Sequence, residues 1–342
     1  MRTRMSFILC LALVATPALA GGTGAPPAAS KFNVVPLVSD QAGVAPNTDP
    51  DLVNAWGISQ QGNGPLWISD NGTGLSSVYD VHTGVKQFDV TIPGGVPTGT
   101  VGVLNPNGFV IQEGTKKGPS YFMFNSESGQ ITGWSPVVDF GNAIVAVDNS
   151  AQGSVYKGLA IDEADSLLYA ADFHNNQVQI FDSGFNKIGA FTDTSLPNRF
   201  APFNVAFLNN KLYVAFAKRQ KNSDDEIDKK GLGYVDVFDK NGNLLQHLIA
   251  NGALNAPWGI ALAPSGFGTL AGDLLVGNFG DGKINVFDPS TGNRLGNLKD
   301  GTGKTIKIDG LWGLQAGPGS AVTFTAGPDD ESHGLLGQLQ PQ

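Results

Sequence analysis

Short apolar runs separated by turn residues recur along most of this 342-residue chain. Residues 256–298 show the pattern in full, with apolar or alternating runs at 258–262, 274–276, 283–287 and 294–298 and Gly, Asn, Asp, Pro and Ser between them. Runs of about four to eight residues rich in β-branched and aromatic side chains, bounded by such turn residues, are typical of strands. The stretch therefore predicts a four-stranded antiparallel sheet.

One such sheet cannot bury both of its faces alone, and the chain supplies six copies of it. A small residue recurs early in the first strand of each copy, at Gly57, Gly99, Gly158, Asn204, Gly259 and Gly313. We expect small residues there because inner strands crowd around the axis of a ring.

The sixth copy has only three strands, and residues 32–38 form a spare strand before the first copy. Placed on the outside of the last copy, the spare strand closes a ring and removes an exposed edge. The sequence therefore predicts an all-β, six-bladed β-propeller, a single domain over residues 31–342, closed by its N-terminal strand. A long β-sandwich or an open array of repeats is the alternative.

Composition agrees with many short strands and tight turns. Glycine is abundant, with 46 residues, only 15% of residues are charged, and no apolar stripe of helical period extends beyond the first twenty residues. The net charge of −9 argues against nucleic acid as a partner and against docking on anionic membranes. We expect a monomer.

The N-terminus has the pattern of a secretory signal. Arg2 and Arg4 precede an apolar core at 7–14, and Ala18-Leu19-Ala20 provides a small-residue cleavage site. This pattern predicts a signal peptide over residues 1–20, a disordered lead over 21–30 and a secreted or periplasmic bacterial protein with no membrane anchor after cleavage. A transmembrane anchor is the alternative, but the core is shorter than the ~20 residues a bilayer requires. The single cysteine, Cys10, lies in that core, so the mature chain has no disulfide, thiol nucleophile or cysteine-bound zinc.

A resemblance supports the fold. Residues 171–182, ADFHNNQVQIFD, resemble an NHL repeat, with its Ala-Asp, its Asn and its apolar pair before an aromatic-Asp. The mature chain, including NAWGI at 54–58, QITGW at 130–134 and APWGI at 256–260, is similar to a family of exported bacterial propellers of unassigned function. The resemblance implies an NHL-like propeller and leaves the activity open.

Two sets of residues are expected at one end of the central channel in such a propeller. The residues that begin the inner strands include Trp56, Lys157, Phe203, Trp258 and Trp312, and those that follow the second strands include Asp70, Asn71, Lys218, Arg219 and Asn278. Aromatic side chains around convergent polar groups are typical of a small-molecule pocket. We therefore predict a ligand-binding site at these ten residues. The alternative is that the tryptophans only pack one blade against the next.

A divalent metal, zinc or calcium, is a second hypothesis, and no cofactor is certain from the sequence. His174 and His333 occupy corresponding loops of the third and sixth copies, and with Asp172, Asp329 and Asp330 they form a candidate site for zinc or manganese. Some NHL-type lyases hold a metal with histidines from several blades, but those sites generally gather more than two. The alternatives are exposed loop histidines, together with turn-forming Asp and Asn residues that could also supply oxygen ligands to calcium. His82 and His247 are expected at the surface.

The loop at 218–230, KRQKNSDDEIDKK, is the densest charge cluster and is expected to overhang the channel end. It is predicted to be either a solvated hairpin extension or a lid that offers Lys218 and Arg219 to an anionic ligand. The function that the sequence favours is an exported binding or interaction module for a small molecule, a glycan or an exported protein. The alternative is a metal-assisted lyase or hydrolase, such as a lactonase, at the same channel face.

Overall fold

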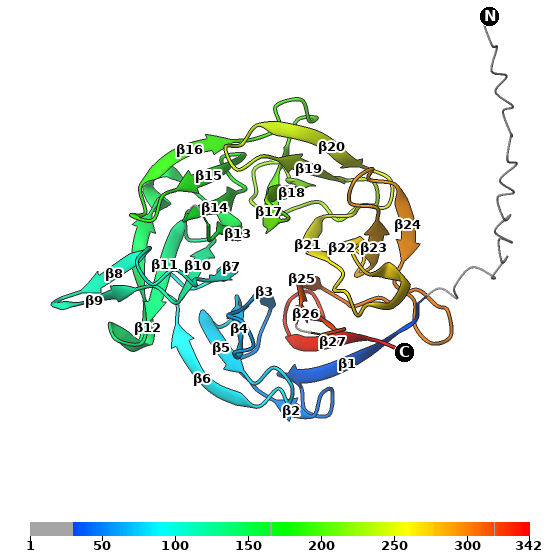
Figure 1. The fold of residues 1–342 in the computed structure, drawn as a ribbon, viewed down its shortest axis with the longest axis horizontal. Coiled ribbons are helices and arrows are strands. Elements are labelled where there is room, and N and C mark those ends of the chain that lie inside the picture. Colours follow the sequence, from blue (N-terminus) through cyan, green and yellow to red (C-terminus); the bar gives the residue numbers. More distant parts are fainter. Residues whose placement is uncertain (1–29, 165, 318) are drawn as a thin grey trace, which may run out of the picture.

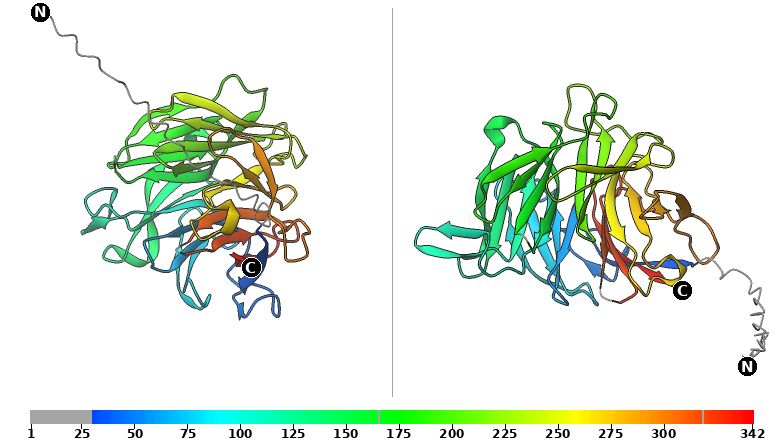
Figure 2. Two further views of the ribbon diagram at one scale, coloured as in Figure 1. Left: turned by 45° about the vertical axis from the view of Figure 1, so that its right-hand side comes forward. Right: turned by 45° about the horizontal axis from the view of Figure 1, so that its top comes forward.

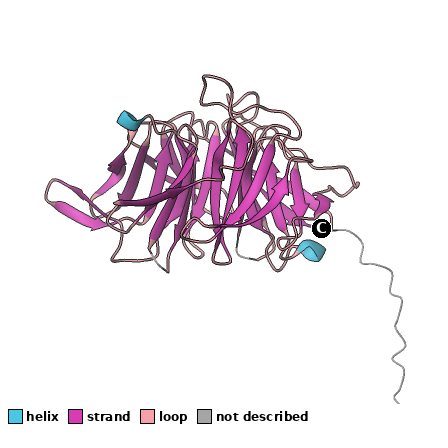
Figure 3. Ribbon diagram, turned by 90° about the horizontal axis from the view of Figure 1, so that it is seen from above, coloured by secondary structure: helices cyan, strands magenta, loops and turns pink. Residues whose placement is uncertain are grey.

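The computed structural model describes residues 30–342 except 165 and 318. The predicted signal peptide and the lead up to residue 29 lie outside the described residues. The described part is a β-propeller: four-stranded antiparallel sheets are arranged around a central axis (Figures 1 and 2). Seen from the side, the molecule is a disc that the strands cross, with loops on both faces (Figure 3).

The described residues form six four-stranded units. The innermost strands are β3 (Ala55–Gln60), β7 (Pro97–Gly102), β13 (Tyr156–Asp162), β17 (Phe200–Leu208), β21 (Pro257–Leu262) and β25 (Leu311–Ala316). The second strands are β4 (Leu66–Asp70), β10 (Phe122–Ser126), β14 (Leu167–Asp172), β18 (Lys211–Lys218), β22 (Leu274–Asn278) and β26 (Val322–Ala326). The third strands are β5 (Leu75–Tyr79), β11 (Gln130–Ser135), β15 (Gln177–Phe181), β19 (Gly233–Phe238), β23 (Ile284–Phe287) and β27 (Leu335–Pro341). The outer strands are β6 (Lys86–Thr91), β12 (Asp139–Asp148), β16 (Lys187–Phe191), β20 (Leu244–Ala250), β24 (Arg294–Asn297) and β1 (Phe32–Ser39).

The spare N-terminal strand lies where the sequence predicted it. β1 pairs antiparallel with β27, from Phe32 opposite Pro341 to Ser39 opposite Leu335, and so completes the sixth unit (Figure 1). The short strand β2 (Asn47–Thr48) continues the same sheet beyond β1, in parallel. A single bridge between Thr91 and Asn142 joins the outer strands of the first two units.

The loop at 105–119 contains an element that the sequence reasoning did not predict. It folds into a separate hairpin of β8 (Val110–Glu113) and β9 (Lys116–Pro119). The helical elements among the described residues are two single 3-10 turns, η1 (Ser150–Gln152) and η2 (Gly268–Leu270), on opposite faces of the disc (Figure 3). No helix in this part of the chain has the length and hydropathy to span a membrane.

The recurring small residue is explained by contacts between inner strands. A Cβ atom on Gly57 would lie 2.5 Å from the carbonyl oxygen of Thr98 in the next inner strand, and one on Gly259 would lie 2.7 Å from that of Trp312. The fourth unit has Asn204 instead, and its amide nitrogen donates a 2.7 Å hydrogen bond to the carbonyl of Trp258. The inner strands therefore approach one another too closely for ordinary side chains at this level of the channel.

Aspartate at the end of the third strand shapes the turn into the outer strand. Asp182 accepts hydrogen bonds from the backbone N–H groups of Gly184 and Asn186, and Asp239 accepts the corresponding pair. These bonds lower the pKa of Asp182. Asp80 and Asp288 occupy the same position in their units and accept hydrogen bonds from the backbone N–H groups two and three residues later. The Asp that follows the aromatic residue in these four units therefore forms an Asx turn, which stabilises the tight hairpin between the third and outer strands.

The core lies between neighbouring sheets, not within one. One cluster joins Tyr169 and Ile180 of the third unit to Leu212, Phe216 and Phe238 of the fourth. Burial of both faces in this way requires neighbours on each side, and a closed ring supplies them to every unit.

Candidate functional site

Four aromatic residues that begin inner strands meet on the axis of the channel. The rings of Trp56 and Trp312 stack with centroids 3.5 Å apart, and the ring of Trp258 stands edge-on to both at 5.8 Å. Phe203 lies 5.9 Å from Trp312, and none of the four side chains is more than 4% exposed. The predicted aromatic group is thus brought together, but its members fill this level of the channel instead of bordering an open space.

Lys157 lies beside this aromatic cluster and is buried. Its ammonium group lies 5.2 Å from the centroid of the Trp56 ring and forms an ion pair with Glu127. Burial by itself would lower the pKa of Lys157, but the charges of Glu127 and Glu226 outweigh it and raise the pKa. Lys157 is therefore a fixed cation at the end of the channel.

Carboxylates from three different units interact electrostatically with Lys157. Glu226 belongs to the loop at 218–230, and burial raises its pKa to about 8, although the charge of Lys157 acts in the opposite direction. Burial also raises the pKa of Glu331, which lies in the loop between β26 and β27 and is affected by Lys157 as well. We call Lys157, Glu127, Glu226 and Glu331 the lysine site. The loop at 218–230 reaches the channel end, as the sequence predicted.

Hydrogen bonds connect the lysine site to the aromatic cluster. Asn71 donates to Glu127 over 2.9 Å, Asn54 donates to Asn71 over 3.2 Å, and the indole N–H of Trp312 donates to Asn54 over 2.9 Å. Of the predicted binding residues, Asn71, Lys157 and the four aromatics therefore form one connected group. Sequence reasoning missed the role of Glu226, although the dense charge of its loop was the available signal.

The remaining predicted binding residues have local structural roles. Asp70 is fully buried and accepts the backbone N–H of Ser77, and burial raises its pKa. Asn278 donates hydrogen bonds to Asp281 in its own turn and to the carbonyl of Ala253 in the segment before β21. Lys218 lies over the ring of Phe200 at 5.3 Å.

Arg219 uses its guanidinium group to hold a neighbouring loop. It donates to the carbonyls of Phe173 and His174, and it lies 3.9 Å from Asp224. Its Nη1 group therefore serves the contact between two loops.

The five predicted metal ligands are not brought together as one group among the described residues. Asp172 is buried and accepts hydrogen bonds from Ser154, Asn175 and Gln179. His174 pairs with Asp224 at 2.7 Å, and His333 pairs with Asp40 at 2.7 Å, with Asp329 4.0 Å away on its other side. Asp329 and Asp330 lie in a turn with positive φ angles.

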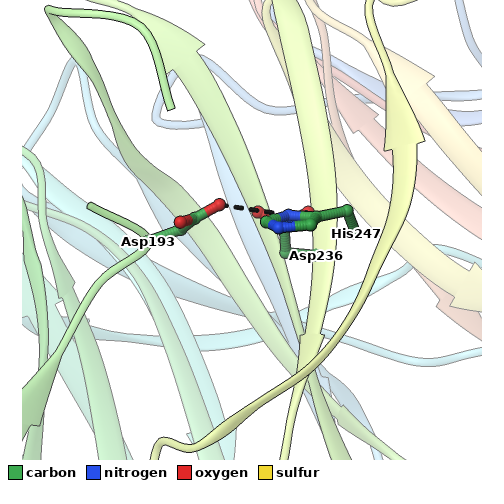
Figure 4. Close-up of side chains that lie close together, drawn as sticks. All are labelled: Asp193, Asp236 and His247. Atoms are coloured by element: carbon green, nitrogen blue, oxygen red, sulfur yellow. Dashed lines mark hydrogen bonds and ion pairs between the residues drawn. The ribbon is translucent and has the colours of Figure 1, made fainter. Parts of the chain in front are cut away.

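Two other groups in the described part of the chain place three potential ligand atoms within 4.8 Å of one another. In the first, Asp49, Asp51 and Asp89 surround the ammonium group of Lys86 at 2.7 to 3.0 Å, so a side-chain cation already fills it. The second comprises Asp193, Asp236 and His247 (Figure 4). Burial and the neighbouring Asp193 raise the pKa of Asp236 to about 7.

A cavity of about 360 Å³ occupies the channel on the other side of the aromatic cluster. Trp258 belongs to its lining, and the rest of the wall comes from later positions of the inner strands, among them Ile58, Leu159, Val205, Phe207, Ile260 and Leu314. Residues toward the ends of these strands, such as Phe207, Leu262 and Gln315, are half-buried, so the cavity opens to solvent there. The aromatic cluster therefore separates an apolar cavity from the charged lysine site.

Comparisons with known proteins identify relatives. No family model matches the chain. Uncharacterized protein R648 of Acanthamoeba polyphaga mimivirus is 33% identical over 319 residues, which cover 89% of this chain and 78% of the relative. Uncharacterized protein L690 of the same virus is 33% identical over 328 residues, covering 91% and 86%. This chain belongs to the family of these two proteins.

Two solved structures resemble this chain in fold alone. A catalytically inactive variant of virginiamycin B lyase from Staphylococcus aureus, solved with quinupristin, aligns with a TM-score of 0.52 and 13% identity over 90% of this chain and 88% of that chain. The selenomethionine-substituted form of that lyase aligns with a TM-score of 0.49 at 14% identity, over 86% and 81%. The similarity to the first of these structures supports the β-propeller fold of this chain.

Proposed function

We propose that this protein is an exported binding propeller whose channel holds a small, largely apolar molecule. The observation that carries the proposal is the channel cavity of about 360 Å³, walled by aliphatic and aromatic side chains and bounded at its inner end by Trp258. Ligand pockets in proteins have volumes of roughly 300–1,000 Å³ and are mostly apolar with a few polar groups. The cavity is too small for a protein segment of any length and too apolar for a glycan, so a small molecule is the favoured partner.

A polar group in the wall supports a more specific ligand. The side-chain oxygen Oε1 of Gln315 is buried and accepts no hydrogen bond within the protein. A buried acceptor without a partner is costly, at about 1–3 kcal/mol, and rotation of this half-buried side chain would offer the oxygen to a ligand that donates a hydrogen bond. The favoured ligand is thus apolar with one hydroxyl or N–H group.

We also propose that the chain is a six-bladed NHL-like propeller and that it is exported. Six four-stranded units, with β1 as the outer strand of the last, support a six-bladed NHL-like propeller. The basic and apolar pattern of residues 2–20 supports export to a periplasm or medium.

Binding of the apolar fluorescent probe 1-anilinonaphthalene-8-sulfonate tests the proposal. We expect saturable, one-to-one binding that Ala316→Trp weakens at least tenfold, because Ala316 lines the exposed rim of the cavity. Ala190→Trp on the outer strand β16 is the matched control, since Ala190 is also exposed and lies away from the channel. Equal probe affinity in both variants would contradict the assignment of the site.

A second candidate function, a lyase or hydrolase at the lysine site, is favoured by one observation. The pKa of Glu226 near 8 keeps this acid protonated at neutral pH beside the cation of Lys157. A carboxylic acid with such a pKa suits proton donation to a leaving group. His174 and His333, which were predicted as metal ligands, pair with aspartates, so this lyase or hydrolase function does not depend on them. Turnover of a lactone panel that is lost in Glu226→Gln, while probe binding persists, would favour this function over simple binding.

A further inference from the structure

Two buried aspartates and one exposed histidine meet between the third and fourth units. Asp193 follows β16, whereas Asp236 on β19 and His247 on β20 are direct partners across an antiparallel pair (Figure 4). The aspartate side chains are 3% and 0% exposed, and the histidine side chain is 53% exposed. The group is therefore buried on its carboxylate side and reachable from solvent on its imidazole side.

The distances in this group are those of ligands around one ion. His247 Nδ1 lies 3.2 Å from Asp193 Oδ2 and 3.3 Å from Asp236 Oδ1. In the other two aspartate-paired histidines, His174 and His333, the Nδ1 atom lies 2.7 Å from one carboxylate oxygen, as in a strong charge-assisted hydrogen bond. Two ligand atoms that each lie about 2.0–2.1 Å from a tetrahedral zinc ion are about 3.3 Å apart. His247 thus stands between two carboxylates at the edge length of such a tetrahedron.

The charges of the group also favour a cation. Neither Asp193 nor Asp236 forms an ion pair with a lysine or arginine in the described part of the chain. The oxygen Oδ2 of Asp236 is buried and has no hydrogen-bond partner. Two adjacent buried carboxylates are expensive unless a proton or a cation neutralises them. The comparable triad of Asp49, Asp51 and Asp89 receives the ammonium group of Lys86, whereas the two buried aspartates here face only the imidazole of His247.

We propose that Asp193, Asp236 and His247 bind one zinc ion. Three protein ligands leave the fourth position to a water molecule on the exposed side of His247, the arrangement of an open zinc site. One nitrogen and two carboxylate oxygens are too few, and of the wrong kind, for the six to eight oxygen ligands of calcium. Because Asp193 follows the third unit and the other two ligands belong to the fourth, the ion ties two neighbouring sheets together outside the channel.

Zinc titration of untagged, chelator-treated protein tests the proposal. We expect one bound zinc per chain by elemental analysis, an intense visible absorption band when cobalt replaces zinc, and a higher melting temperature in zinc than in chelator. His247→Ala and Asp236→Asn should each weaken zinc binding by more than about 100-fold, because even the loss of a residue that only orients a ligand costs about 10–100-fold. His174→Ala, which removes an exposed histidine next to a single aspartate, should leave the affinity unchanged.

Each outcome has a definite meaning. His247 is exposed and Asp236→Asn conserves shape, so both variants are expected to melt cooperatively in chelator. The zinc-dependent rise in melting temperature should then be absent from these two variants alone. Substoichiometric zinc, or full affinity in His247→Ala, would overturn the proposal. The probe-binding assay of the channel is independent of this result, so the two proposals fail or succeed separately.

Discussion

Replacement of Gly57 by alanine tests whether close contact between inner strands holds the ring together. The added Cβ would lie 2.5 Å from the carbonyl oxygen of Thr98 and 2.9 Å from the backbone nitrogen of Thr100. Both obstacles are backbone atoms of β7, so no side-chain rotation can relieve them. The two strands must move apart, or the channel wall must distort.

The expected loss follows from two opposing effects. Overpacking of a well-packed interior costs about 1–3 kcal/mol, and replacing glycine by alanine returns about 0.4–1 kcal/mol through the unfolded state. We therefore expect Gly57→Ala to lower the free energy of unfolding by about 1–2 kcal/mol. For a domain of this size the melting temperature would fall by about 2–5 °C.

Gly141→Ala in β12 is the matched control. Its nearest neighbour would be Asp139 Oδ1 at 3.8 Å, an ordinary contact, and its φ angle is compatible with alanine. Urea denaturation of both variants should show opposite signs, with Gly141→Ala gaining up to about 1 kcal/mol. If Gly57→Ala is as stable as Gly141→Ala, crowding at the axis is not what selects glycine there.

Three further predictions concern the closing strand and the lysine site. Phe32→Ala should lower the free energy of unfolding by about 3–5 kcal/mol in thermal or urea denaturation, because Phe32 is fully buried and stacks on Phe267. Val34 is 39% exposed on the same strand, so Val34→Ala should change stability by less than about 1 kcal/mol. Equal losses in the two variants would mean that β1 contributes no side chain to the core. Lys157→Met should cost about 2 kcal/mol at neutral pH because it leaves Glu127 without its cation, and urea unfolding with no such loss would contradict the buried ion pair. The pKa of Glu226 rises from 4.5 to about 8 on folding, so the folded state binds the extra proton and wild-type stability falls as pH rises between these values. Urea unfolding should therefore show Glu226→Gln gaining on wild type from pH 5 to pH 8, and a constant difference would refute the shift.

The repeated sheets could be predicted from the sequence because their signals are local. Each strand has its own apolar run, and each turn has its own Gly, Asn or Asp, so no long-range information is needed. The pairing of residues 32–38 with the last unit also followed, because a three-stranded unit and an unused strand are complementary. The hairpin of β8 and β9 was missed, since residues 105–119 have few apolar side chains and a short hairpin depends on its turn.

The candidate site was harder to predict because it depends on packing. Equivalence between repeats correctly brought Trp56, Phe203, Trp258 and Trp312 to one level of the channel. Sequence periodicity does not contain the channel radius, however, so it could not show that the four rings would fill the space. The position of Glu226 near Lys157 could not be predicted for the same reason, because it depends on the conformation of a long loop.

The partners of His247 could not be predicted for a different reason. An exposed position on an outer strand is correct for its side chain, but its partners are set by strand register and by the neighbouring unit. Asp236 lies opposite His247 only because β19 and β20 pair with a bulge between Val235 and Asp236. Asp193 belongs to the segment that follows β16, a strand of the neighbouring sheet. Neither relation is visible in a single sequence.

The pairing of β1 with β27 also determines how the molecule would respond to mechanical force. Phe32 and Pro341 are opposite each other, so the two ends of this pair lie side by side. A load applied between them peels the strands apart one hydrogen bond at a time, instead of shearing all the bonds of the pair together. The ring would open at low tension at this seam, however resistant it is to heat, and the first extension would release the outer strand of the sixth unit.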